Sequence, residues 1–165
     1  MRRLTVVMTA VALVGGLAWV AIAATGGGTS PVNCMDTVWS TTQASTSSTQ
    51  FATVPGFTDA PSAIFPISIN VSALVSGAPV EFRVLSTNVG GQTHASKPGP
   101  TSFVPPGGSP DSFVYQWIER NQSAAVHSNS LKLQWRSPSG SAAHLLRGDM
   151  SVQYTTENGG CVGSS

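Results

Sequence analysis

The stretch Ile67-Ser68-Ile69-Asn70-Val71-Ser72-Ala73-Leu74-Val75 decides the fold of this chain. Apolar side chains occupy every second position of this stretch, and Ser, Asn and Ser fill three of the four positions between them. A period of two places one face of a β-strand against a core and the other in water. Gly77-Ala78-Pro79 turns the chain, and residues 80–84 then alternate in the same way. We therefore expect residues 67–75 and 80–84 to form an antiparallel pair with a short connection.

The same alternation recurs along the rest of the chain. Residues 131–136 form the clearest amphipathic strand, because Leu131, Leu133 and Trp135 alternate with Lys, Gln and Arg. Helix formers such as Glu, Lys and Leu are scarce, whereas Val, Ser and Thr are abundant. Further strands are expected soon after Cys34 and at 51–54, 103–104, 113–118, 143–146 and 150–155. Roughly eight or nine short strands predict an all-β fold, a two-sheet antiparallel β-sandwich.

The aromatic and hydroxyl residues refine this picture. Trp117 and Trp135 share the apolar faces of their strands, so we expect both in the core, whereas Trp39 is less constrained. Residues 41–50 include seven Ser or Thr. That bias favours a polar loop or a solvent-facing edge strand over an O-glycosylated stalk, which would be longer.

The N-terminus reads as an export signal helix. Met1, Arg2 and Arg3 form a basic start, residues 4–24 carry no charge, and Ala21-Ile22-Ala23 offers small residues for cleavage. We divide the chain into a signal peptide at 1–23, a flexible spacer at 24–33, a single β-sandwich domain at 34–161 and a tail at 162–165. An uncleaved anchor is the alternative. The protein is then secreted and extracellular, without membrane contact after cleavage, or is held on the extracytoplasmic face.

Two cysteines bracket nearly all of the exported part. Cys34 and Cys161 are the chain's two cysteines. Because export places them in an oxidising compartment, we predict that they form a disulfide.

Charge excludes some partners. The chain has eight basic and seven acidic residues, and 9% of its residues are charged. Cleavage removes Arg2 and Arg3 and leaves a net charge near −1. This balance does not predict binding to nucleic acid or to an anionic membrane.

Three strand motifs carry a resemblance. Residues 77–84, the segment from His127 through 131–136, and residues 150–154 resemble a pattern in small exported bacterial proteins. That resemblance covers roughly residues 50–155 and implies a jelly-roll-type sandwich, related in shape to secreted and phage-associated binding modules. It implies no activity and assigns no functional residue.

The loops hold the best candidates for a binding site. Residues 86–112 contain five Gly and five Pro, and a connection this long is either ordered for a function or a mobile connector. We expect function to reside in loops, with residues 87–111 as the leading candidate. Asn88, Gln92 and Asp111 offer polar contacts there, and Trp39 offers an aromatic platform for a sugar.

Catalytic and metal sites find little support in the sequence. No serine sits in a Gly-x-Ser-x-Gly motif, and the three histidines, His94, His127 and His144, are far apart. Glu81 and Glu119 are more readily explained as solvated strand-face residues than as a glycosidase pair. The Arg147-Gly148-Asp149 tripeptide, which integrins recognise, is better explained as a turn into the last strand. Calcium at Asp59, Asp111 or Asp149 lacks an Asp-x-Asp run.

We therefore predict a secreted, non-enzymatic binding or surface module, with no catalytic residue, metal or cofactor. A cell-envelope glycan or protein is the candidate partner. A small exported hydrolase and a virion-associated structural module are the alternatives.

Overall fold

The computed structural model describes residues 32–41, 43–61, 64–88, 90–120 and 130–156, together with residue 161. They all belong to the second of two units of the chain, Met1–Ser30 and Pro31–Ser165. The predicted signal helix lies outside the described residues. Ten strands and one short 3-10 helix are described: β1 (Val32–Ser40), β2 (Ala44–Thr46), β3 (Ala52–Asp59), β4 (Ile64–Gly77), β5 (Val80–Thr87), β6 (Thr93–Ala95), β7 (Thr101–Phe103), η1 (Pro106–Gly108), β8 (Asp111–Glu119), β9 (Ser130–Arg136) and β10 (Ala143–Thr156).

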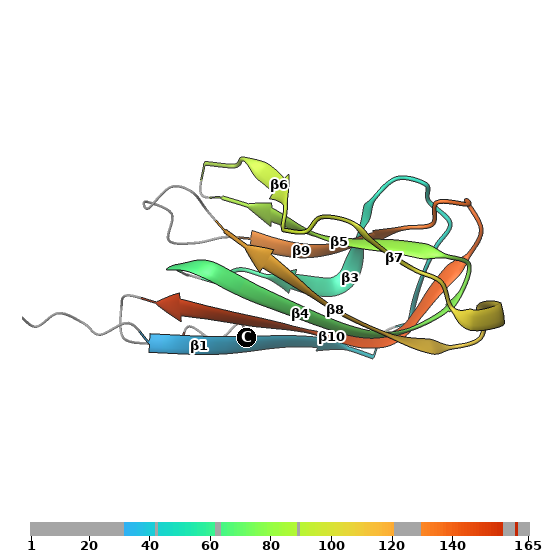
Figure 1. Cartoon of the computed structure of the whole chain (residues 1–165), viewed down its shortest axis with the longest axis horizontal. Helices are drawn as coiled ribbons and strands as arrows, with labels where there is room; N and C mark the ends of the chain where they lie inside the picture. The colour runs from blue at the N-terminus through green and yellow to red at the C-terminus, as the bar shows by residue number, and fades with distance from the viewer. Residues whose placement is uncertain are drawn as a thin grey trace, which may run out of the picture. The chain divides into compact units, whose positions relative to one another are not determined.

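The strands form two antiparallel sheets that pack face to face (Figure 1). Sheet 1 has the order β1-β10-β4-β8, with β2 also paired to β10, and sheet 2 has the order β3-β9-β5-β6, with β7 also paired to β5. Early and late strands pair in nested order, because β1 pairs with β10, β3 with β9, β4 with β8, and β5 with β6 and β7. This is the arrangement of a long ribbon folded back and wrapped into a jelly roll. The predicted fold class is confirmed.

The expected pairing of residues 67–75 with 80–84 is wrong. The first stretch lies in β4 of sheet 1 and the second in β5 of sheet 2. Both strands direct their apolar face into the same core, which each can do from its own side of the sandwich. Gly77, between them, has a φ of +86°, and a Cβ there would lie 2.6 Å from the carbonyl oxygen of Ala142. The segment that we expected to form a hairpin turn therefore carries the chain from one sheet to the other.

Strand β3 continues past the point where we expected it to end. Pro55-Gly56 lies inside β3, where the pairing with β9 shifts register between Thr53 and Thr58. A proline without an N–H is tolerated here because β3 is the edge strand of sheet 2.

Strand β10 joins two strands that we predicted separately. The turn expected at Arg147-Gly148-Asp149 is wrong, because these residues lie within β10 after a register shift between Leu145 and Arg147. A Cβ on Gly148 would lie 2.8 Å from the Ser72 carbonyl oxygen and 3.1 Å from the Phe57 ring. Close approach of its neighbours, rather than a turn, explains this glycine.

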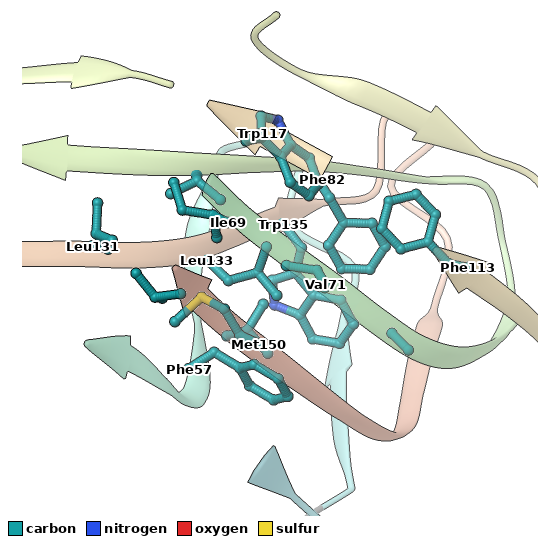
Figure 2. Close-up of a cluster of buried hydrophobic side chains, with 14 of the residues drawn as sticks. Phe57, Ile69, Val71, Phe82, Phe113, Trp117, Leu131, Leu133, Trp135 and Met150 are labelled. Atoms are coloured by element: carbon teal, nitrogen blue, oxygen red, sulfur yellow. The ribbon is translucent and has the colours of Figure 1, made fainter. Parts of the chain in front are cut away.

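Aromatic side chains from both sheets fill the core (Figure 2). Phe82 of sheet 2 stacks on Phe113 of sheet 1 at 4.8 Å between ring centroids, and on Trp135 at 6.2 Å. Trp117 and Trp135 are buried, as predicted.

The predicted disulfide is confirmed, and it lies where the ends of the domain meet. Val32 is opposite Thr156 in the β1–β10 pair, and Cys34 is bonded to Cys161 with an S–S distance of 2.01 Å. The first strand begins at Val32, two residues before the predicted start of the domain. In the described part of the chain, no helix has the length and apolar character needed to cross a membrane.

Candidate functional site

The described residues between β5 and β8, which are 88 and 90–110, run along one side of the sandwich. Strands β6 and β7 pair with the two ends of β5 and so extend sheet 2. Between them the chain reaches across to sheet 1, where Lys97 N donates to the Ile118 carbonyl oxygen and Ile118 N to that of Lys97, at 3.0 and 2.8 Å. We call residues 93–103 the strap, because they link the edges of the two sheets.

A buried carboxylate anchors the strap. Glu119, at the end of β8, is 1% exposed. His94 Nε2 lies 2.7 Å from its Oε1, and Ser96 Oγ donates to its Oε2 at 2.9 Å. The expectation that Glu119 is a solvated strand-face residue is wrong. Side chains alternate between the two faces of β8, and Glu119 is an even number of positions from Phe113 and Trp117. The alternation that turns these two aromatic side chains inward therefore turns Glu119 inward as well.

The Glu119 cluster does not have the geometry of a serine hydrolase. In that chemistry one nitrogen of the histidine contacts the carboxylate and the other the nucleophile. Here Ser96 binds the carboxylate itself, and among the described residues no hydroxyl or thiol is hydrogen-bonded to His94. Glu81 points outward from sheet 2 and pairs with Arg136 at 2.8 Å, so the two glutamates do not face one cleft.

The outer face of sheet 1 carries mostly uncharged side chains. Residues alternate inward and outward along each strand, and Trp39, Asp149, Ser72 and Val114 form one outward row across the four strands. Trp39 is 71% and Val114 73% exposed. Met35, four residues before Trp39 on the same face of β1, is 63% exposed. Most other outward positions hold hydroxyls or amides: Asn33, Thr37, Ser68, Asn70, Ser112, Gln116, Ser151, Gln153 and Thr155.

Two hollows lie on this face. The larger, about 540 Å³, lies near the disulfide and is lined by residues including Met35, Ser68, Gln116, Arg120 and Gln153. The smaller, about 240 Å³, lies beside Trp39, and Ser72, Ser112, Arg147, Gly148 and Asp149 contribute to its lining.

The predicted ligand-binding residues do not converge. Asn88 and Gln92 bond to each other in the turn between β5 and β6, where Asn88 Nδ2 donates to Gln92 Oε1 at 3.0 Å and Gln92 N donates to Asn88 Oδ1 at 2.9 Å. Asp111 lies at the far end of β8 from Glu119, and its Oδ1 accepts from Ser112 N. Trp39 is on the outer face of sheet 1. Of these four residues, Trp39 lines one of the two hollows described above.

Met35, Val114 and Asp149 share the outer face of sheet 1 with Trp39, and we did not predict this from the sequence. Alternation along β1 could have placed Met35 on the same face as Trp39. The contribution of β8 and β10 required the strand order.

Two acidic side chains are buried: Asp36, in the middle of the β1–β10 pairing, and Asp59, the last residue of β3. Tyr154 Oη donates to Asp36 Oδ2 at 2.9 Å, and burial, with this hydrogen bond, raises the pKa of Tyr154 to about 12. Asp59 Oδ1 accepts from Ala60 N, while its buried Oδ2 has no hydrogen-bond partner among the described residues. Burial raises the pKa of Asp59, and the charge of Asp36 raises it further. No group of three or more His, Cys, Asp or Glu in the described ranges could hold a metal ion.

No family model matches the chain, and no curated protein is similar to it. Among solved structures, the chain is similar to one described as the structure of infectious bursal disease virus Gx strain, with 16% identity and a TM-score of 0.48, covering 79% of this chain and 34% of that one. It is also similar to the crystal structure of the infectious bursal disease virus VP2 subviral particle, with 16% identity and a TM-score of 0.49, covering 78% and 34%. The chain spans about a third of the length of these proteins. The likeness extends to the fold alone, and the resemblance to exported bacterial proteins stays a prediction.

Proposed function

We propose that the protein is a non-enzymatic, extracytoplasmic binding module that binds an uncharged glycan on the outer face of sheet 1. The observation that carries this proposal is the exposure of Trp39. Of the three tryptophans in the described residues, Trp117 and Trp135 are buried, whereas Trp39 is 71% exposed. An exposed indole does not contribute its large apolar contact area to the core. An aromatic ring beside a polar hollow is a suitable surface for a sugar.

The surroundings of Trp39 supply the second half of a sugar site. A sugar ring stacks its C–H face on an aromatic ring while its hydroxyls exchange hydrogen bonds with polar groups. The residues that line the hollow beside Trp39 include Ser72 and Ser112, which carry hydroxyls, and Arg147 and Asp149, which carry charges. The row of hydroxyls and amides beyond it, towards Met35, would continue the contacts along a chain of sugars.

The experiment is a screen of the purified domain against a glycan array and cell-envelope polymers, followed by Trp39→Ala. We expect the variant to lose binding at least tenfold, the effect of about 1.4 kcal/mol, with an unchanged melting temperature. Val104→Ala is the matched control, because Val104 is 63% exposed and lies outside this face. Equal binding by wild type and Trp39→Ala would refute the proposal.

A second candidate is self-assembly through the same face. The exposed side chains of Met35, Trp39 and Val114 favour it, because large apolar side chains exposed on one sheet face can mark a protein interface. Sedimentation at increasing concentration separates the two functions. Self-association that Val114→Ser abolishes, without any glycan binding, would favour assembly.

A further inference from the structure

The outer face of sheet 2 differs in chemistry from that of sheet 1. Its outward positions include Arg83 on β5 and Lys132 and Arg136 on β9, with Glu81 as the neighbouring carboxylate. Three cations against one anion give this small area a net positive charge, although the net charge of the whole chain is only +1. We call Phe51, Glu81, Arg83, Gln134 and Arg136 the arginine cluster.

One aromatic ring holds both guanidinium groups of the cluster. The Cζ atom of Arg83 lies 4.1 Å and that of Arg136 4.6 Å from the centroid of Phe51. Cation–π contacts of this kind restrain a guanidinium in place. Because the side chains are ordered before any ligand arrives, binding would cost less conformational entropy.

The two arginines differ in how their charge is compensated. Arg136 Nε and Nη2 both lie 2.8 Å from Glu81 Oε2. Arg83 Nε donates to the neutral amide oxygen of Gln134 at 2.9 Å, and no carboxylate in the described residues forms an ion pair with it. Burial, together with the charge of Arg136, lowers the pKa of Arg83. The cluster thus holds a cation that no carboxylate of the described residues neutralises.

We propose that the arginine cluster binds an oxyanion group, phosphate or sulfate, carried by an anionic polymer. The fork of N–H donors on a guanidinium matches the oxygens of such a group, and a cation with no carboxylate partner supplies the attraction. Lys132, two residues from Gln134 on the same face of β9, extends the positive area along the sheet. This site lies on the opposite sheet from Trp39 and does not depend on the glycan proposal.

The test measures binding of the oxidised domain to immobilised heparin, a sulfated polysaccharide, and to polyphosphate at several salt concentrations. We expect wild type to bind at least one of them, and the polymer that binds identifies sulfate or phosphate as the group. Arg83→Gln should weaken binding on the order of tenfold and lower the slope of log K against log salt by about one. Glu81→Gln should tighten binding, because it removes the one competing carboxylate and frees Arg136.

Lys97→Gln is the matched control, since Lys97 is exposed on the strap and loses the same charge without touching the cluster. We expect its binding to equal that of wild type.

Arg83→Lys keeps the positive charge but lacks the fork of N–H donors. It should therefore bind more weakly than wild type with the same salt slope. This variant also replaces Arg83→Gln in the test if Arg83→Gln does not fold. Absence of binding to both polymers at low salt would overturn the proposal. Equal losses for Arg83→Gln and Lys97→Gln would overturn it too, because binding would then follow net charge alone. Retained binding by Trp39→Ala supports a site separate from the glycan surface.

Discussion

Asp59 shows at the scale of one residue how burial and charge oppose each other. Its side chain is buried, one carboxyl oxygen accepts a backbone hydrogen bond, and the other has no partner in the described part of the chain. Desolvation disfavours the charged form of a carboxyl group, and the charge of Asp36 acts in the same direction. The folded protein therefore favours protonated Asp59 more strongly than the unfolded chain does.

This shift predicts a pH dependence of stability. A carboxyl group with a raised folded-state pKa contributes stability that is present below its ordinary value of 3.8 and is lost as the pH rises through the folded pKa. Asp59→Asn is neutral at every pH and does not undergo this loss. We expect the unfolding free energy of Asp59→Asn, relative to wild type, to increase from pH 3.5 to pH 7. Urea denaturation at several pH values measures it, and a difference that is independent of pH would contradict the assignment.

At the scale of the element, the strap explains why the long segment between β5 and β8 is ordered. We expected this segment to be either functional or a mobile connector. The structure shows strand pairing with β5, the Lys97–Ile118 bridge and a hydrogen bond from Trp117 Nε1 to the Gly99 carbonyl oxygen at 2.8 Å. These bonds offset the ordering entropy of a segment with little apolar content. Whether it also binds a ligand stays a prediction.

The strap yields a stability prediction. Ser96→Ala removes the hydroxyl that donates to Glu119 Oε2 and leaves a buried carboxylate oxygen without that partner. We expect a loss of about 1–3 kcal/mol in the unfolding free energy. Ser102→Ala on β7 is the matched control, because its hydroxyl is exposed and 3.4 Å from Glu81, and its loss should be close to zero. Equal stability of the two variants in guanidinium denaturation would mean that Glu119 does not anchor the strap.

At the scale of the whole molecule, the disulfide constrains nearly all of the domain. Cys34 and Cys161 are 127 residues apart, and chain-entropy reasoning assigns about 4–5 kcal/mol to a loop of that length. The double variant Cys34→Ala/Cys161→Ala should lose stability up to that amount and keep the same fold, because β1 and β10 remain paired along their length. Chemical denaturation of the two proteins measures the loss. An unchanged midpoint would show that the unfolded chain is not restrained by the bond.

Alternation within single strands was enough to predict much of the fold. It identified the buried faces of β4, β5, β8 and β9 and the core positions of Trp117 and Trp135, because a period of two depends on the backbone alone. The disulfide followed from the number of cysteines and the expected export. For the candidate site, the sequence left the position of Trp39 open and could not assign its neighbours on the surface.

The tertiary structure alone decided which strands are neighbours. The sequence by itself determined that β4 and β5 each have one buried face, but the nested pairing of early with late strands placed them in different sheets. The same pairing merged the two halves of β10 across a register shift, brought His94 and Ser96 to Glu119, and set Asp149 and Val114 in one row with Trp39. A strand's periodicity specifies the face that it buries. Its partner depends on contacts between residues far apart in the chain, whose stability is settled only when the whole core is assembled.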